Sequence, residues 1–182
     1  MSNTVYIATS IDGYIARKDG TIDWLMGLPN PNNSDYGFSV SLDRIDGIIM
    51  GRKSFETVLE FEEWPYVKPV PVFVLSNSLH ELPYKLPVKV EIVRGELKRI
   101  IELLKDRGII NLYVDGGKTI QSFLKEDLID EMIITRIPIV LGSGIPLFDN
   151  DNLELTFEHV ETEVYNNMLV RSKYLRKRSL KD

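Results

Sequence analysis

The chain has 182 residues, of which 43% are hydrophobic and 27% are charged, so we expect one soluble globular domain over residues 1–182. The formal net charge of −5 argues against general binding to nucleic acid or to an anionic membrane surface. Cysteine is absent and neither histidine has a carboxylate at ligand spacing, which excludes disulfides, thiolate nucleophiles and zinc–thiolate sites, so we expect no metal site.

Residues 5–8 are the first predicted strand, and residues 9–16 follow as a turn with a second short extended piece. No basic region and long apolar run precede this strand, and no segment has 18 uninterrupted apolar residues, so we expect a cytoplasmic protein without a membrane span. The long loop over residues 17–33 keeps Trp24 and two further large apolar residues. Such a loop is typical of a lid or pocket wall, and the equally favoured alternative is that Trp24 plugs the edge of the core.

Residues 34–45 are predicted to form a helix with Ser34 as its N-cap. Its apolar face is imperfect and includes Phe38 and Leu42. Asp35 lies in the first turn, where the helix dipole favours an acid even on an ordinary surface helix.

A strand over residues 47–50 ends at Gly51 and leads into a helix that reaches about residue 59. Arg52 and Lys53, followed by Ser54, crowd the start of this helix. The positive end of a helix dipole disfavours a cation by up to about 1 kcal/mol, so a bound anion would offset this cost.

Two further strands, over residues 71–76 and 89–93, are followed by an amphipathic helix over residues 96–107. The first of these strands runs into Ser76 and Asn77, whose small polar side chains suit a phosphate or a ribose. The same residues also fit an ordinary polar turn.

The apolar residues 110–114 predict a buried strand, and the Asp-Gly-Gly turn at residues 115–117 leads into another helix. Lys118 and Thr119 lie in the first turn of that helix, so a cation again lies at a positive dipole end. This is not a Walker A loop, because that motif requires glycine at the position of Leu112. Two cationic helix starts in an acidic protein favour a ligand with more than one phosphate.

The remaining segments are a strand over residues 128–137, a connection over residues 138–148 that contains Gly142, Ser143 and Gly144, and a hairpin over residues 153–164 and 168–176. The basic end, residues 171–181, is expected to be a solvated tail. Strands that alternate with helices before a closing hairpin imply an α/β fold, with a mostly parallel central sheet, helices on both faces and an antiparallel edge.

These segments resemble the dihydrofolate reductase superfamily along nearly the whole chain, and most of all the C-terminal reductase domain of the bacterial bifunctional riboflavin deaminase-reductases and its stand-alone relatives. The resemblance implies the three-layer dihydrofolate reductase-like fold. The matching pieces are ATSIDGYIA from Ala8, DGIIMGRKSFE from Asp46, VFVLSN from Val72, LYVDGGKTIQSFL from Leu112 and LIDEMIITRIPIVLGSGIPLF from Leu128.

The resemblance implies a reductase that uses NADPH, and relatives are commonly homodimers. The cofactor-binding residues that it implies are Ala8 and Ile15 at the nicotinamide carboxamide, Gly51, Arg52, Lys53, Ser54, Ser76 and Asn77 on the adenosine 2′-phosphate side, and Gly116, Gly117, Lys118 and Thr119 at the pyrophosphate.

The same resemblance implies a substrate pocket bounded by Trp24, Asp35, Thr135 and the glycine loop at residues 142–144. Asp35 matches the acid that binds the pterin in dihydrofolate reductases, and Thr135 matches the threonine that supports it. We expect desolvation to raise the pKa of Asp35, so that it supplies or relays a proton as hydride arrives.

Three functions remain open at this point. In the riboflavin family, the segment after the first cationic turn carries an aspartate, a proline and an arginine that help to bind the ribose phosphate, whereas this chain has Glu62 and Glu63 there. In many dihydrofolate reductases a tyrosine stands where this chain has Ile120. The candidates are therefore a reductase of a phosphoribosylamino-uracil, a dihydrofolate reductase, and an NADP-binding protein without turnover.

Overall fold

The computed structural model describes residues 1–30, 34–66, 68–83, 85–148 and 153–178. Its helices are α1 (Asp23–Met26), α2 (Phe38–Leu42), α3 (Arg52–Leu59), α4 (Leu97–Asp106) and α5 (Gly117–Lys125). The strands of its main sheet are β1 (Ser2–Ser10), β3 (Gly47–Gly51), β4 (Val72–Leu75), β5 (Val90–Val93), β6 (Asn111–Asp115), β7 (Glu131–Ile137), β9 (Phe157–Tyr165) and β10 (Leu169–Arg176). Within these described ranges, every helix is too short or too polar to cross a membrane.

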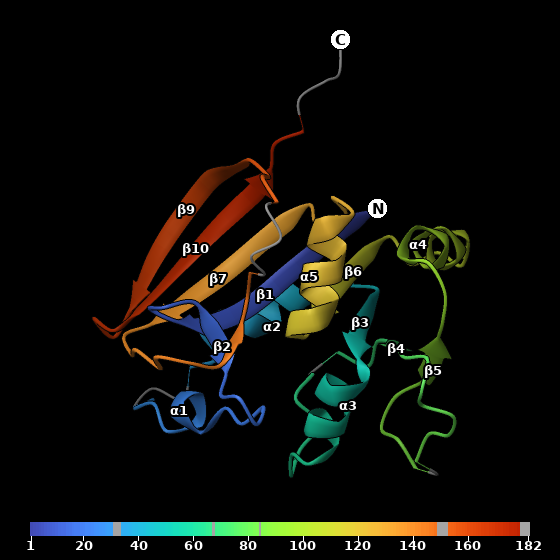
Figure 1. The fold of residues 1–182 in the computed structure, drawn as a ribbon, viewed down its shortest axis with the longest axis horizontal. Helices are drawn as coiled ribbons and strands as arrows, with labels where there is room; N and C mark the ends of the chain where they lie inside the picture. Colours follow the sequence, from blue (N-terminus) through green and yellow to red (C-terminus); the bar gives the residue numbers. More distant parts are fainter. Residues whose placement is uncertain (31–33, 67, 84, 149–152, 179–182) are drawn as a thin grey trace.

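The eight strands form one sheet in the order β5-β4-β3-β6-β1-β7-β10-β9. The six strands from β5 to β7 are parallel, and β10 and β9 add to the β7 side in antiparallel orientation. Figure 1 shows the hairpin of β9 and β10 at one end of the sheet and β5 at the other. The expected α/β fold with a mostly parallel sheet and a closing hairpin is confirmed.

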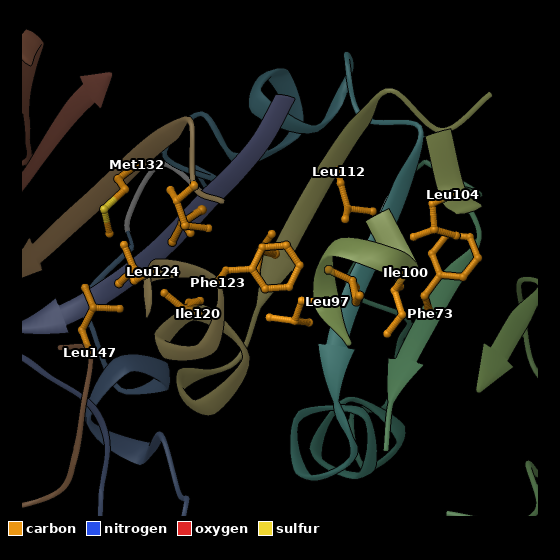
Figure 2. Close-up of a cluster of buried hydrophobic side chains, with 14 residues drawn as sticks. Phe73, Leu97, Ile100, Leu104, Leu112, Ile120, Phe123, Leu124, Met132 and Leu147 are labelled. Atoms are coloured by element: carbon orange, nitrogen blue, oxygen red, sulfur yellow. The ribbon is translucent and has the colours of Figure 1, made fainter. Parts of the chain in front are cut away.

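Helices cover both faces of the parallel part of the sheet. On one face, α4 and α5 pack on strand residues such as Ile49 and Val114, and Figure 2 shows Phe123 of α5 within this cluster. On the other face, α2 and α3 pack on Ile48, Met50 and Tyr113. Because successive strand residues point to opposite faces, the short apolar runs predicted for these strands supply both layers.

A second, two-stranded sheet was not predicted from the sequence. It pairs β2 (Tyr14–Ala16) with β8 (Ile145–Pro146) in antiparallel orientation, and Leu147 N–H donates to Gly13 O over 3.0 Å. Strands of two or three residues carry too few side chains to show a period, so nothing in the sequence marked β8.

The predicted start of the helix over residues 34–45 is wrong. The helix α2 begins only at Phe38, because Tyr36 and Gly37 adopt left-handed backbone conformations with φ of 52° and 83°. Ser34 is therefore not an N-cap of this helix. Asp35 takes over part of that role, since its carboxylate accepts the backbone N–H of Gly37 and of Ser39, each over 2.9 Å.

The hairpin begins later than predicted, at Phe157 instead of residue 153, and Asn166 and Asn167 form its turn with φ of 52° each. The expectation of a solvated basic tail is wrong for its first part. The Arg171 side chain is only 16% exposed and that of Arg176 only 10%, because ion pairs hold them to Glu163 and Asp127. Residues 179–181 of the predicted tail lie outside the described residues.

Trp24 belongs to α1, in the loop predicted over residues 17–33, of which residues 31–33 are not described. Its side chain is buried against Ile137 and Leu169. This packing agrees with the alternative that Trp24 closes the edge of the core.

Candidate functional site

The two cationic helix starts lie side by side at one edge of the sheet. Strands β3 and β6 are parallel neighbours, with Met50 opposite Asp115, so Gly51 and Gly116 follow at the same level. A Cβ on Gly51 would lie 3.1 Å from Thr119 Oγ1, and a Cβ on Gly116 would overlap Ser54 Oγ. We refer to residues 51–54 and 116–119 as the two glycine turns.

Both glycine turns leave backbone N–H groups open at a positive helix end. The N-cap residues of α3 and α5 are Gly51 and Gly116, which have no side chain to cap the helix. Arg52 forms an ion pair with Glu56 over 3.2 Å, and its side chain is still 42% exposed. Lys118 is exposed and has no ion-pair partner among the described residues. This combination of free N–H groups and cations is suited to phosphate groups.

The turn after β4 adjoins the first glycine turn. Arg52 donates to Ser78 Oγ over 3.2 Å, and Ser76 Oγ accepts the N–H of Ser78 and of Leu79. Arg94, which was not among the site residues predicted from the sequence, follows the neighbouring strand β5 and donates to Ser76 O over 3.2 Å. A cation directly after a parallel strand was the available signal, because the carboxyl ends of parallel strands meet at one edge.

Ile15 of β2 and Ile145, which directly follows the glycine loop at residues 142–144, lie against the second glycine turn. A Cβ on Gly117 would lie 2.8 Å from Ile15 Cδ1 and 3.2 Å from Ile145 Cγ2. Asp12 Oδ1 accepts the N–H of Leu141 over 3.1 Å, and Asp12 Oδ2 accepts that of Gly142 over 2.7 Å. These bonds fasten the loop to the turn between β1 and β2.

Gly144 packs directly on β2, since a Cβ there would overlap Ala16 O and lie 3.2 Å from Tyr14 Cβ. Ser143 in the same loop is exposed. The loop thus contacts Asp12 and β2, and β2 carries Ile15, which is expected to hold the nicotinamide.

Ala8 and Thr135 are opposite residues of β1 and β7, and Thr135 is opposite Arg171 of β10. The hydroxyl of Thr135 is buried without a hydrogen-bond partner among the described residues, and so are Trp24 Nε1, Trp64 Nε1 and Tyr36 Oη. Buried polar groups are normally satisfied, so the Thr135 hydroxyl, opposite Ala8, is a candidate to receive a ligand.

The pKa of Asp35 is shifted in the direction opposite to the predicted one. Its side chain is exposed, and hydrogen bonds from Ser39 and from the N–H of Gly37 lower its pKa below the usual value. The expected rise in pKa by desolvation is therefore wrong, because the turn before α2 holds the carboxylate in its charged form.

Asp115 has the raised pKa that was expected of Asp35. It is half-buried at the end of β6, and burial raises its pKa although Tyr66 Oη donates to it over 3.1 Å and Gly116 N–H over 2.8 Å. From the sequence, Asp115 was predicted only as part of a turn. A carboxyl that is neutral more readily than usual and lies beside a glycine turn is a candidate proton donor.

An aromatic cluster connects the region of Asp35 with Asp115. Neighbouring rings in it lie 5.2 to 6.3 Å apart between centroids, and Tyr113 Oη donates to Tyr6 O over 3.0 Å. These residues were not predicted to lie together, because they come from two strands, a helix and a loop that are far apart in the sequence. The members of the cluster are Tyr6, Phe38, Trp64, Tyr66 and Tyr113.

Comparison with known proteins gives concordant results. Residues 3–170 match the family model described as the RibD C-terminal domain. The uncharacterized protein YwjB of Bacillus subtilis (strain 168) is 38% identical over 147 residues, which are 79% of this chain and 80% of YwjB. The crystal structure of a "Putative riboflavin biosynthesis protein" from Shewanella sp. PV-4 has 52% sequence identity and a TM-score of 0.91, and the match covers 98% of this chain and 100% of that one.

The dihydrofolate reductase of Enterococcus faecalis, complexed with NADP(H), has a TM-score of 0.65 with 15% identity, over 97% of each chain. At that identity the likeness shows a common fold.

Proposed function

Because the chain belongs to the RibD C-terminal domain family, we propose that it is an NADPH-dependent reductase that acts on a small heterocyclic or ribosylamino-pyrimidine substrate. The reaction class is that of 5-amino-6-(5-phosphoribosylamino)uracil reductase in riboflavin biosynthesis. The proposal also takes the protein to be cytoplasmic, as expected for an enzyme of this kind.

The observation that carries the proposal is the adjacency of the two glycine turns. Arg52 and Lys118 lie in the first turns of helices that follow neighbouring parallel strands, and Gly51 and Gly116 contact residues of the opposite turn. One dinucleotide can therefore neutralise both helix starts, whereas an ordinary pair of surface helices gains nothing from cations at these positions.

The residues present fit NADPH. The second glycine turn would hold the pyrophosphate through its backbone N–H groups and Lys118. Arg52, Lys53, Ser76, Asn77 and, from the structure, Arg94 would surround the adenosine 2′-phosphate. Ala8 and Ile15 would bind the nicotinamide carboxamide. When bound, NADPH supplies the hydride, and the protein supplies position and exclusion of water.

The protein side of the reaction is divided between two carboxyl groups. Asp35, held in its charged form, would accept a hydrogen bond from an N–H of the heterocycle, with Thr135 as a second polar contact. Asp115, whose raised pKa favours the neutral acid, would supply the proton that balances hydride addition. The rings of the aromatic cluster would stack on the planar substrate.

Dihydrofolate reductase activity is the second candidate. It is favoured by Asp35 and the buried Thr135 hydroxyl, both on the aromatic-cluster face, and by the exposed acids Glu62 and Glu63 before Trp64, which would repel a substrate phosphate. Parallel assays with NADPH and either dihydrofolate or the phosphoribosylamino-uracil separate the two activities. Binding of NADPH without oxidation by either acceptor would instead indicate a binding protein without turnover.

Thermal unfolding with NADPH, NADH and 2′-phospho-AMP tests the cofactor proposal. A ligand that binds only the folded state stabilises it by RT ln(1 + [L]/Kd), or about 2.7 kcal/mol at 100 times Kd. We expect NADPH to raise Tm by several degrees, 2′-phospho-AMP to raise it less, and NADH to raise it least because it lacks the 2′-phosphate. An equal shift with NADH and NADPH would refute the assignment of the 2′-phosphate site, and no shift with any of them would refute the cofactor.

We further propose a homodimer. The support is an apolar part of the sheet away from the glycine turns, where β7, β10 and the segment before β9 line a cavity of about 350 Å³. Phe148 and Leu153 beside it are 54% and 43% exposed. A second copy would cover these side chains. Sedimentation velocity over a hundredfold range of concentration should give a dimer mass, and a monomer at all concentrations would refute this proposal.

A further inference from the structure

The turn before α2 contains a strained residue. Tyr36 has φ of 52°, in the left-handed region that a bulky side chain rarely adopts, and Gly37 follows with φ of 83°. The carboxylate of Asp35 depends on this turn, because it accepts the N–H of Gly37 and of Ser39 across it. Something outside the turn must hold Tyr36 in this conformation.

Arg171 of β10 supplies that support. Its Nη1 donates to Tyr36 O over 2.8 Å, and Tyr6 Oη donates to the same carbonyl over 2.9 Å. The guanidinium also fills the space beside Gly37, where any Cβ would overlap Nη1. The turn is thus held through its carbonyl and packed from its open side by one arginine.

The hairpin fixes Arg171 in turn. Its Nη2 forms an ion pair with Glu163 of β9, and its guanidinium lies 5.3 Å from the ring centroid of Tyr165. Tyr165 also meets the ring of Tyr36, with centroids 5.5 Å apart in an edge-on arrangement. Because β9 and β10 are paired over their full length, Arg171 stands on a rigid element rather than on a loop.

We infer that Arg171 is a positioning residue, which holds the left-handed Tyr36–Gly37 turn and thereby fixes the carboxylate of Asp35 toward the substrate. This rests on the function proposed above, in which Asp35 contacts the heterocycle. It assigns the closing hairpin a role in the site, although Arg171 is 136 residues from Asp35 in the sequence.

The test is a pH titration of Asp35 in the protein, in which carbon NMR of the side-chain carboxyl monitors its protonation. In R171Q the turn loosens and the hydrogen bonds from Gly37 and Ser39 weaken, so the pKa of Asp35 should rise toward the ordinary aspartate value. The conservative R171K should restore part of the low value. In parallel, kcat/KM should fall about 10- to 100-fold in R171Q, as expected when a contact group is misplaced by about 1 Å, with NADPH affinity unchanged.

The control is R44Q, which removes another arginine that pairs with a glutamate, Glu131, on the same sheet face. R44Q should leave the pKa of Asp35 unchanged. Asp12, whose pKa is also lowered by hydrogen bonds, is an internal reference that no variant should move. G37A, in which the added Cβ displaces the guanidinium, should reproduce the R171Q result from the other side of the contact.

An unchanged Asp35 titration in folded R171Q and G37A would overturn the inference, whatever the activity. If instead the titration shifts as expected but the wild-type protein neither binds nor oxidises NADPH, the proposed function fails and the positioning of Asp35 by Arg171 stands.

Discussion

Replacing Arg52 and Lys118 together with glutamine should weaken NADPH binding about 100-fold or more, and each single change should weaken it about 10-fold. A hydrogen bond to a charged group contributes about 1.5 to 3 kcal/mol, and the lower end applies here because both side chains are partly or fully exposed. Isothermal titration calorimetry at two salt concentrations measures the effect, which should shrink at high salt because ions screen exposed charges.

The stability of the protein without ligand should not fall when one of these cations is removed. A cation at a helix N-terminus is destabilising by about 0.3 to 1 kcal/mol, so K118Q without ligand should be as stable as the wild type or slightly more stable. K105Q, which makes the same change in net charge in the last turn of α4, is the matched control and should leave NADPH affinity unchanged. Equal loss of affinity in K105Q and K118Q would show that net charge alone is responsible.

Asp115→Asn should lower turnover about 100- to 10,000-fold, which is the usual contribution of a positioned acid or base, while NADPH affinity changes little. Asparagine keeps the shape of the side chain. Its Oδ1 can accept the N–H of Gly116, and its Nδ2 can donate to Tyr66 Oη in place of the bond that Tyr66 now donates to the second carboxylate oxygen, so the fold should be retained. Stopped-flow measurement of NADPH oxidation in a single turnover separates the chemical step from cofactor binding.

The pH dependence of turnover tests whether Asp115 acts as a proton donor. Burial raises its pKa in the folded protein, so wild-type kcat should be highest below that pKa and should fall as pH rises through it. The neutral form also contributes stability below the ordinary aspartate pKa, and this contribution is lost as pH rises through the raised value. Both trends should be absent in D115N. Full turnover in D115N, or an unchanged pH profile, would contradict the assignment.

The elements that sequence could predict are those whose pattern is local. The strands around Ile49 and Val114 are short apolar runs, and α4 repeats apolar residues at helical spacing, so their bounds agree with the predicted ones within one residue. The glycine turns were also predicted, because the helix dipole disfavours a cation at a helix start unless an anion binds there. The pairing of β3 with β6 brought those starts together.

The features that could not be predicted depend on contacts between residues that are far apart in the sequence. The low pKa of Asp35 depends on a turn that Arg171 holds from the last strand, and a pattern within residues 34–45 favoured an ordinary N-capped helix instead. The surroundings of Asp115 include Tyr66, which donates a hydrogen bond to it from a loop with no periodicity. In both cases tertiary contacts decided the local conformation or charge state, and local propensity did not.

The packing of Gly117 between Ile15 and Ile145 has a consequence for synthesis of the protein on the ribosome. The two isoleucines come from β2 and β8, which pair with each other, and β8 is translated after all five helices. A nascent chain therefore cannot assemble the wall behind the second glycine turn until Ile145 has left the exit tunnel. If the second glycine turn binds the coenzyme as proposed, the coenzyme can stabilise only chains in which Ile145 is already free to fold, and fragments that end before Ile145 gain no protection from it.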